Sequence, residues 1–236
     1  MFEMRDFVDV ETLCRELKAS ESSVRRDLGI LESENALKRV YGGAIPVPLA
    51  GEYALETVRL GEEKNQIARV AASLIEEGQT VILDGGTTVA AVARELAHKS
   101  IHVITNSLPI AEVLESHRNI ELTLTGGYLD PRIRVMLGPF CEQMIGAICA
   151  DAVIMGIGSI SESGFSNNNT LVVGSEKKMI EVADRMIVVA DHTKFGRGGM
   201  FHVASLAAAD VVVSDRDLAP QYAELMRMHN IELHLA

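Results

Sequence analysis

The sequence predicts an α/β protein in which a small winged helix-turn-helix module precedes a mainly parallel, Rossmann-like sheet domain. Two short amphipathic segments, separated by a turn and followed by a Gly-Gly hairpin, predict the first module. Over the remaining chain, runs rich in β-branched residues alternate with helical segments, which is typical of a parallel sheet with right-handed crossovers. Hydrophobic residues make up 47% and aromatic residues only 4%, so aliphatic side chains must form the core.

The first helix of the module is expected over residues 10–17. Val10, Leu13, Cys14 and Leu17 follow the spacing of one helix face. The pattern breaks after Leu17, and Ser20 is a residue type that caps the N-terminus of a following helix.

The second helix is expected from about residue 21 to residue 33. Val24, Leu28 and Leu31 form its apolar stripe. In a helix-turn-helix, the early residues of the second helix meet base edges and phosphates. The residues that fall mostly off this stripe are Ser22, Arg25, Arg26 and Gly29.

A short hairpin, or wing, is expected over residues 36–45. Gly42-Gly43 supplies its turn, and basic side chains beside that turn can reach phosphates or the minor groove. The alternative is that each arginine is an ordinary solvated surface residue. The residues that we expect to contact DNA are Ser22, Ser23, Arg25, Arg26, Lys38, Arg39, Tyr41 and Gly42.

The charge of the chain does not exclude DNA binding. The formal net charge is −11, but residues 1–45 account for only −2 of it, so the acidity belongs mostly to the rest of the chain. A protein binds DNA through local phosphate contacts, and one basic face is sufficient.

Proline and glycine interrupt the pattern over residues 46–60, which we interpret as a linker. This places the DNA-binding domain at residues 1–45 and a second, α/β domain at residues 61–236. The second domain is expected to begin with a helix over about residues 62–77, ended by Gly78.

Small, hydroxyl-bearing and glycine residues follow successive predicted strands of the second domain, at the sheet edge where ligands bind in open parallel sheets. The loop Asp84-Gly85-Gly86-Thr87-Thr88 opens a helix, and a helix N-terminus suits a phosphate. The alternative is a glycine-rich turn with capping threonines and no ligand. The residues that we expect to bind an effector are Asp84, Gly86, Thr87, Thr88, Thr105, Asn106, Ser107, Gly126, Gly127, Gly156 and Lys194.

Several classes of protein are not indicated. No Gly-Lys-Ser/Thr follows the glycines, no G-x-G-x-x-G opens a helix, and the histidines lack metal-ligand spacing, so we expect no cofactor and no metal. No apolar run reaches about 18 residues, and the N-terminus lacks signal-peptide features. The three cysteines form no CxxC motif. We therefore expect a cytoplasmic protein without a membrane partner.

These motifs resemble the DeoR family of bacterial transcriptional regulators. In the first module the resemblance is carried by Ser20, by "SVRRDL" from Ser23, and by "RVYGGA" from Arg39. In the second it is carried by "LDGGTT", "TNS", "TGG", "GFSNNN" and "ADHTKFG". Three departures are Asn35 for a usual Gly, Tyr41 for a usual His, and Gly174 where a sub-group has Glu.

The resemblance implies a second domain related in fold to ribose-5-phosphate isomerases and CoA transferases that binds phosphorylated sugars or related metabolites. It implies a transcriptional regulator, expected to repress carbohydrate or sugar-acid catabolism genes and to leave operator DNA when the effector binds. A homo-oligomer, dimer or tetramer, is expected. The alternative from another class is a sugar-phosphate isomerase-like enzyme, but no catalytic residue is expected.

The segment before Val10 is short for this family, whose first helix covers the next two. We therefore expect that helix to be shortened and residues 1–45 to be the less stable, weakly DNA-binding part. The aliphatic residues that we expect to be partly uncovered are Val10, Leu13, Leu17, Val24 and Leu28.

Overall fold

A computed structural model of the chain describes residues 8–33, 37–40, 42–46, 53, 56 and 59–236. Its contacts form two compact units, one that ends at Arg59 and one that contains nearly all of the chain from Leu60 to Ala236. Most of the expected linker, and the segment Met1–Phe7 where we expect a shortened first helix, lie outside the described residues. No helix in the described part of the chain is long and apolar enough to cross a membrane.

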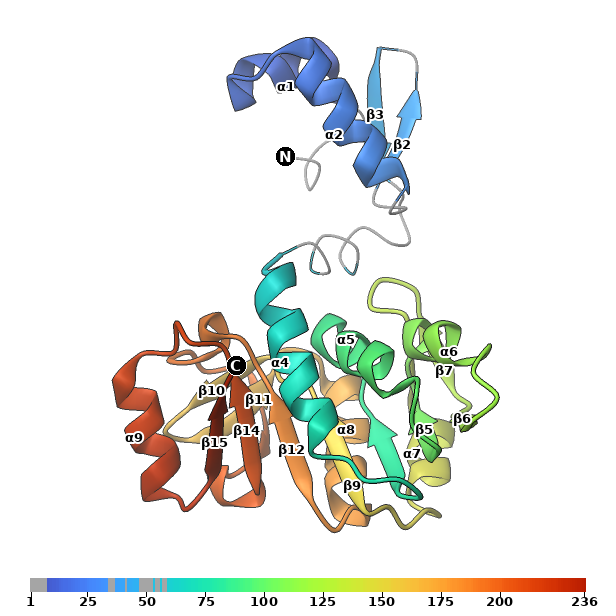
Figure 1. Cartoon of the computed structure of the whole chain (residues 1–236), viewed down its shortest axis with the longest axis vertical. Helices are drawn as coiled ribbons and strands as arrows, with labels where there is room; N and C mark the ends of the chain where they lie inside the picture. Colours follow the sequence, from blue (N-terminus) through green and yellow to red (C-terminus); the bar gives the residue numbers. More distant parts are fainter. Residues whose placement is uncertain (1–7, 34–36, 41, 47–52, 54–55, 57–58) are drawn as a thin grey trace. The chain divides into compact units, whose positions relative to one another are not determined.

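The first unit is a helix-turn-helix with a wing, as expected (Figure 1). The carboxylate of Asp9 caps its first helix by accepting from Thr12 N at 2.7 Å. Lys18 ends that helix in a left-handed conformation, φ 51°, and the Ser20 hydroxyl accepts from Ser23 N at 3.2 Å in the next. Its elements are β1 (Val8–Asp9), α1 (Val10–Leu17), α2 (Glu21–Ser33), β2 (Leu37–Val40) and β3 (Gly43–Pro46).

The core of this unit corrects the expectation that its aliphatic residues are uncovered. Four of the five named residues are buried, and only Leu17, at 59%, is exposed. Strand β1 extends the wing by pairing with β3. Side chains of the three strands pack against the apolar faces of the two helices, a contact that helical spacing in the sequence does not predict. The buried residues that form this small core are Val8, Val10, Leu13, Val24, Leu28, Leu37 and Ala44.

The second unit is built on a seven-stranded sheet in the order β15-β14-β12-β9-β4-β5-β6. Every neighbouring pair is parallel, as the alternation of strands and helices predicts. The strands are β4 (Thr80–Leu83), β5 (Ile101–Thr105), β6 (Ile120–Leu124), β9 (Ala152–Met155), β12 (Met186–Val189), β14 (Val211–Ser214) and β15 (Glu232–Leu235).

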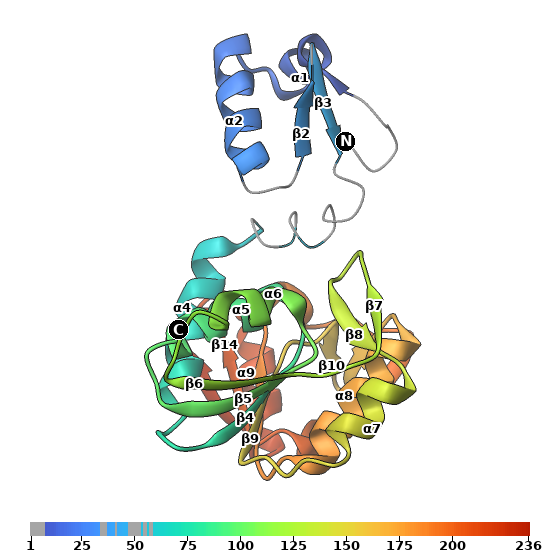
Figure 2. The same cartoon turned by 90° about the vertical axis from the view of Figure 1, so that its right-hand side faces the viewer.

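Helices cover both faces of this sheet. On β4, Val81 and Leu83 pack into the core under α4, α5 and α6, whereas Ile82 packs into the core under α7, α8 and α9. Figure 2 shows α7 and α8 side by side, across the sheet from α4 and α5. The helices are α4 (Gly61–Ser73), α5 (Thr87–Leu96), α6 (Leu108–Leu114), α7 (Pro139–Ile145), α8 (Thr170–Val182) and α9 (Pro220–Met228), with 3₁₀ turns η2 (His192–Lys194) and η3 (Leu206–Ala208).

Two features differ from the sequence prediction. Helix α4 ends at Ser73 rather than near residue 77, because Leu74 N and Ile75 N tighten the last turn by donating to carbonyls three residues back. Short antiparallel strands also lie in the connections, where no periodic pattern marked them. They are β7 (Tyr128–Asp130), β8 (Val135–Leu137), β10 (Ser159–Ser161), β11 (Gly164–Asn167) and β13 (Phe201–Ala204).

Candidate functional site

The N-terminal half of α2 presents polar and basic residues. Ser22 is exposed and Ser23 is half-buried. The hydroxyls of both lie 2.9 Å from the Ser20 hydroxyl, so the three serines form a hydroxyl cluster at the start of the helix. Hydroxyls and backbone N–H groups at a helix start are the groups that commonly contact a phosphate of DNA.

The two arginines of α2 have different environments. Arg25 donates through Nε to Glu21 Oε1 at 2.8 Å, an exposed pair within the helix. The Arg26 side chain is 75% exposed, and its Nε lies 3.8 Å from the Asp27 carboxylate. Exposed pairs of this kind are weak, so DNA phosphates can replace both acids.

The wing is tied to α2 through Arg39. Arg39 donates to the Glu32 carboxylate from its backbone N at 2.9 Å and from Nε at 2.6 Å. Gly42 is exposed with φ +82°, as a tight turn requires. The side chain of Lys38 and the whole of Tyr41 lie outside the described residues.

In the second unit, the loop after β4 is tightly packed. Asp84 is buried, and Thr87 and Thr88 are each 8% exposed in the first turn of α5. A Cβ at residue 85 would stand 2.2 Å from Val135 Cγ1, so only glycine fits there. Gly86 begins the helix with φ +137°, which also requires glycine.

The loop after β5 combines structural and unpaired polar groups. The Thr105 hydroxyl donates to Leu83 O at 2.7 Å and accepts from Ser107 N at 3.0 Å, so its role is to hold the two loops together. Asn106 Oδ1 and Ser107 Oγ are buried and have no hydrogen-bond partner among the described residues. Unpaired buried acceptors are rare and indicate an unfilled requirement for a donor.

The loops after β6 and β9 contribute mainly backbone. Gly126 and Gly127 are exposed, and a Cβ at residue 127 would approach Leu137 O to 2.6 Å. A Cβ at residue 156 would lie 3.7 Å from Gly85 O, so the β9 loop lies against the β4 loop. The structure thus brings the predicted residues after β4, β5 and β9 together.

The loop after β12 carries Lys194. Asp191 is buried and accepts from the backbone N and the hydroxyl of Thr193. Lys194 N donates to Asp191 O at 3.0 Å, which closes the 3₁₀ turn η2. Because β12 neighbours β9, this turn lies at the same edge of the sheet as the other loops, one strand further from β4.

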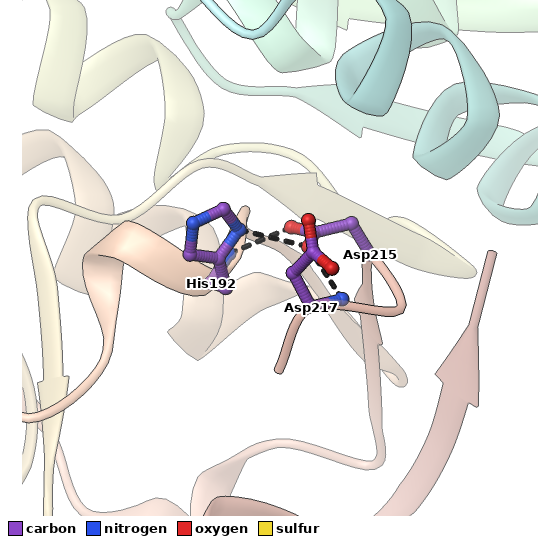
Figure 3. Close-up of side chains that lie close together, drawn as sticks. All are labelled: His192, Asp215 and Asp217. Atoms are coloured by element: carbon purple, nitrogen blue, oxygen red, sulfur yellow. Dashed lines mark hydrogen bonds and ion pairs between the residues drawn. The ribbon is translucent and has the colours of Figure 1, made fainter. Parts of the chain in front are cut away.

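A cluster of His192, Asp215 and Asp217 lies beside this turn, with potential metal-ligand atoms within 4.8 Å of one another (Figure 3). Asp215 Oδ1 lies 2.8 Å from His192 Nδ1 and accepts from Asp217 N at 3.0 Å. Asp215 Oδ2 accepts from His192 N at 2.7 Å. These bonds give both oxygens of the Asp215 carboxylate a protein partner. We therefore interpret the cluster as a link between the loops after β12 and β14, not as a metal site.

Sequence reasoning missed Glu176. It lies on α8 with 1% exposure, on the same buried stripe as Val173 and Met179. Asn167 Nδ2 donates to Glu176 Oε1 at 2.8 Å, whereas Glu176 Oε2 has no partner among the described residues. The available signal was a carboxylate at helical spacing among apolar residues.

Burial sets the protonation of two carboxyl groups. It raises the pKa of Glu176 to about 7, opposed by the hydrogen bond from Asn167. It also raises the pKa of Asp84, and the negative charge of Glu176 raises it further. The sheet edge therefore holds two interacting carboxyl groups that ionise less readily than exposed ones.

Gly174 on α8 lies next to Glu142 on α7. A Cβ at residue 174 would stand 2.5 Å from Glu142 Oε1. The Glu142 carboxylate therefore occupies the space beside the position where a family sub-group has a glutamate, and any larger residue at 174 would require that flexible carboxylate to move.

Two family models match the chain. Residues 1–47 match the DeoR-like helix-turn-helix domain, and residues 60–216 match the DeoR C terminal sensor domain. The HTH-type transcriptional repressor GlcR of Bacillus subtilis is 35% identical over 96% of this chain and 89% of that protein. The Glycerol-3-phosphate regulon repressor of Escherichia coli is 30% identical over 100% of this chain and 95% of that protein.

Solved structures of lower similarity also match part of the chain. The match to ribose 5-phosphate isomerase A from Methanocaldococcus jannaschii has a TM-score of 0.43 and 17% identity. It covers 57% of this chain and 54% of the isomerase, so the chain spans about half of that enzyme's length.

Proposed function

The chain belongs to the DeoR family of DNA-binding transcriptional regulators, and on that premise we propose that it is a repressor released from its operator by a phosphorylated sugar or related metabolite. The domain assignment is part of the proposal: residues 1–45 bind DNA, residues 46–60 link, and residues 61–236 sense the effector. One observation carries it. A helix-turn-helix with exposed arginines on its second helix shares a chain with a sheet edge whose buried polar atoms include some without a partner among the described residues.

The release mechanism is linkage between the two binding events. If the effector binds the DNA-competent state less well than the released state, it weakens operator binding by the same factor by which DNA weakens effector binding. A typical coupling is about 1–3 kcal/mol, or about 5–150-fold.

The chemistry of the edge supports an anionic, hydroxylated effector. The first turn of α5, with Thr87 and Thr88, provides backbone N–H groups and hydroxyls for a phosphate. Lys194 lies in the 3₁₀ turn after β12, at the same edge of the sheet but two strands from β4, and adds a cation. The name of the E. coli relative, a glycerol-3-phosphate regulon repressor, agrees with a phosphorylated polyol or sugar as the effector.

We propose that the protein acts in the cytoplasm as a homo-oligomer, a dimer or tetramer, because regulators with one small module per chain commonly bind two half-sites. Analytical ultracentrifugation of the full chain tests the assembly. A monomer at micromolar concentration that still binds operator tightly would contradict it.

One observation favours a different function, a sugar-phosphate isomerase-like enzyme. Glu176 is a buried carboxyl whose pKa of about 7 suits proton transfer at neutral pH. We propose that it does not catalyse, since the relatives are named as regulators. A turnover assay with ribose 5-phosphate separates the two: formation of the ketose by the wild type, lost in Glu176→Gln, would establish the enzyme.

The repressor proposal is tested by fluorescence anisotropy with DNA from the promoter region of the protein's own gene. We expect binding that weakens with salt and that a phosphorylated sugar or polyol reverses. If no such compound affected DNA binding, effector control would be contradicted. If the protein bound unrelated DNA equally well, the presence of a specific operator in this DNA would be contradicted.

A further inference from the structure

Two buried polar groups at the sheet edge lack a hydrogen-bond partner in the described part of the chain, and their chemistry indicates what kind of ligand group could pair with them. Glu176 Oε2 and Asn106 Oδ1 are buried acceptors without a partner among the described residues. Both amide and carboxylate oxygens need donors, and leaving a buried acceptor unpaired costs free energy. A ligand hydroxyl can donate to Asn106 Oδ1, and it can pair with Glu176 Oε2 whether that carboxyl group is ionised or protonated.

Contacts between loops bring these groups into one place. Asn106 Oδ1 lies 3.9 Å from where a Cβ on Gly85 would stand, beside the loop that begins with Asp84. On the other side, Gly156 approaches Gly85 O, and Gly158 in the same β9 loop has Asn167 Oδ1 at 3.2 Å from its Cβ position. Asn167 in turn donates to Glu176. The β4, β5 and β9 loops and α8 thus surround one region.

The region also disfavours negative charge, since burial raises the pKa of both Asp84 and Glu176. Burial raises the pKa of the Cys141 thiol, and the charges of Glu142 and Asp84 raise it further, which places both carboxylates within electrostatic range of one buried atom. The charge of Glu176 acts on Asp84 in the same sense. A ligand carboxylate or phosphate here would face the same desolvation that raises the pKa of these two carboxyl groups.

We propose that Asp84, Asn106 and Glu176 form a hydroxyl-recognition subsite that accepts the neutral polyhydroxyl end of the effector and rejects a carboxylate end. The inference rests on the proposed sensing function and narrows it to phosphorylated sugars or polyols rather than phosphorylated sugar acids. A hydroxyl donates to the unpaired oxygens, whereas a carboxylate has only acceptors and adds a negative charge. Sites built to hydrogen-bond a hydroxyl discriminate strongly against ligands that lack it.

Matched ligand pairs test this with the full wild-type chain. Glucitol 6-phosphate and 6-phosphogluconate differ only in a terminal CH₂OH or carboxylate, and glycerol 3-phosphate and 3-phosphoglycerate differ in the same way. We expect calorimetric titration to show tighter binding of the alcohol in at least one pair, by about tenfold or more. Glu176→Gln should shrink that ratio, because a neutral amide can donate to a carboxylate. Glu181→Gln, an exposed change on the same helix, should leave it unchanged.

Each failure has its own pattern. Equal or tighter binding of the acids to wild type would overturn the subsite and leave effector sensing intact. Absence of binding by all four compounds, and by other phosphorylated sugars and polyols, would overturn the proposed sensing function and this inference with it. The wild-type comparison needs no variant, and Asp84→Asn provides a second variant if Glu176→Gln does not fold. An unchanged ratio in a folded variant of either residue would exclude that residue from the subsite.

Discussion

Glu32 near the end of the second helix accepts two hydrogen bonds from Arg39 of the wing, one from the backbone N and one from the guanidinium. This pair links the two elements that the family resemblance assigns to DNA. Arg39 is therefore both a structural contact and a proposed DNA contact, and the two roles can be separated.

The first prediction separates these roles. Glu32→Gln keeps an acceptor for the Arg39 backbone but removes the competing charge, so operator affinity should stay the same or rise. Arg39→Ala should weaken binding and reduce the slope of log affinity against log salt by about one unit. Equal losses in both variants would show that Arg39 serves only to hold the wing. The exposed pair itself should contribute less than about 1 kcal/mol to stability.

The second prediction concerns the exposed face of α2. Arg25→Ala with Arg26→Ala should weaken operator binding by about 1–3 kcal/mol for each arginine that reads a base, with a smaller salt slope for each that contacts a phosphate. Anisotropy over a salt series measures both. Arg216→Ala with Arg227→Ala, two exposed arginines of the second unit, is the matched control. If the α2 double variant binds operator like wild type, the docking face is wrong.

The third prediction assigns Lys194 to the effector. Lys194→Ala should raise the effector concentration for half-release by about tenfold or more, since hydrogen bonds to charged groups contribute about 1.5–3 kcal/mol. Operator binding without effector should remain near normal. Lys177→Ala, an exposed change on α8, serves as the control. Unchanged release with lost DNA binding would reverse the assignment.

The fourth prediction is a pH dependence. The pKa of Glu176 rises on folding from 4.5 to about 7, so between these values the native state holds more protons than the unfolded state. Stability is therefore full below the unfolded pKa and falls as pH rises toward 7, by up to about 3 kcal/mol. Urea denaturation followed by circular dichroism between about pH 5 and pH 8 should show this fall. Glu176→Gln should reduce this fall without abolishing it, because burial also raises the pKa of Asp84. An equal fall in that variant would show that Glu176 does not cause it.

The fifth prediction concerns the relative stability of the two units. The helix-turn-helix core is small, whereas each sheet face of the second unit has an extensive buried cluster. Amides across Val24–Leu31 should therefore exchange hydrogen faster than amides of β4 and β12. The first unit is expected to be less stable because its core is small, not because its helices are uncovered. Equal protection in a hydrogen-exchange measurement would contradict it.

Much of the architecture follows from local pattern in the sequence. Helical spacing placed α1 and α2, and β-branched runs located β4, β5, β6, β9, β12 and β14, because burial of one face imposes the period of each element. Strand ends marked by glycine, threonine and asparagine also identified the loops of the candidate site. These features depend on residues that are close in sequence.

Other features required the tertiary structure. Strand β1 completes the wing and buries the helices that the sequence left uncovered, and this pairing joins distant segments. The meeting of Asp84 with Glu176 likewise depends on β9 lying beside β4 and on Asn167 reaching α8. Sequence showed Glu176 as one acidic residue on a helix. Only the fold, by removing water from it and placing it near a second carboxyl group, decided its chemistry, because desolvation and charge proximity are properties of three-dimensional packing rather than of local sequence.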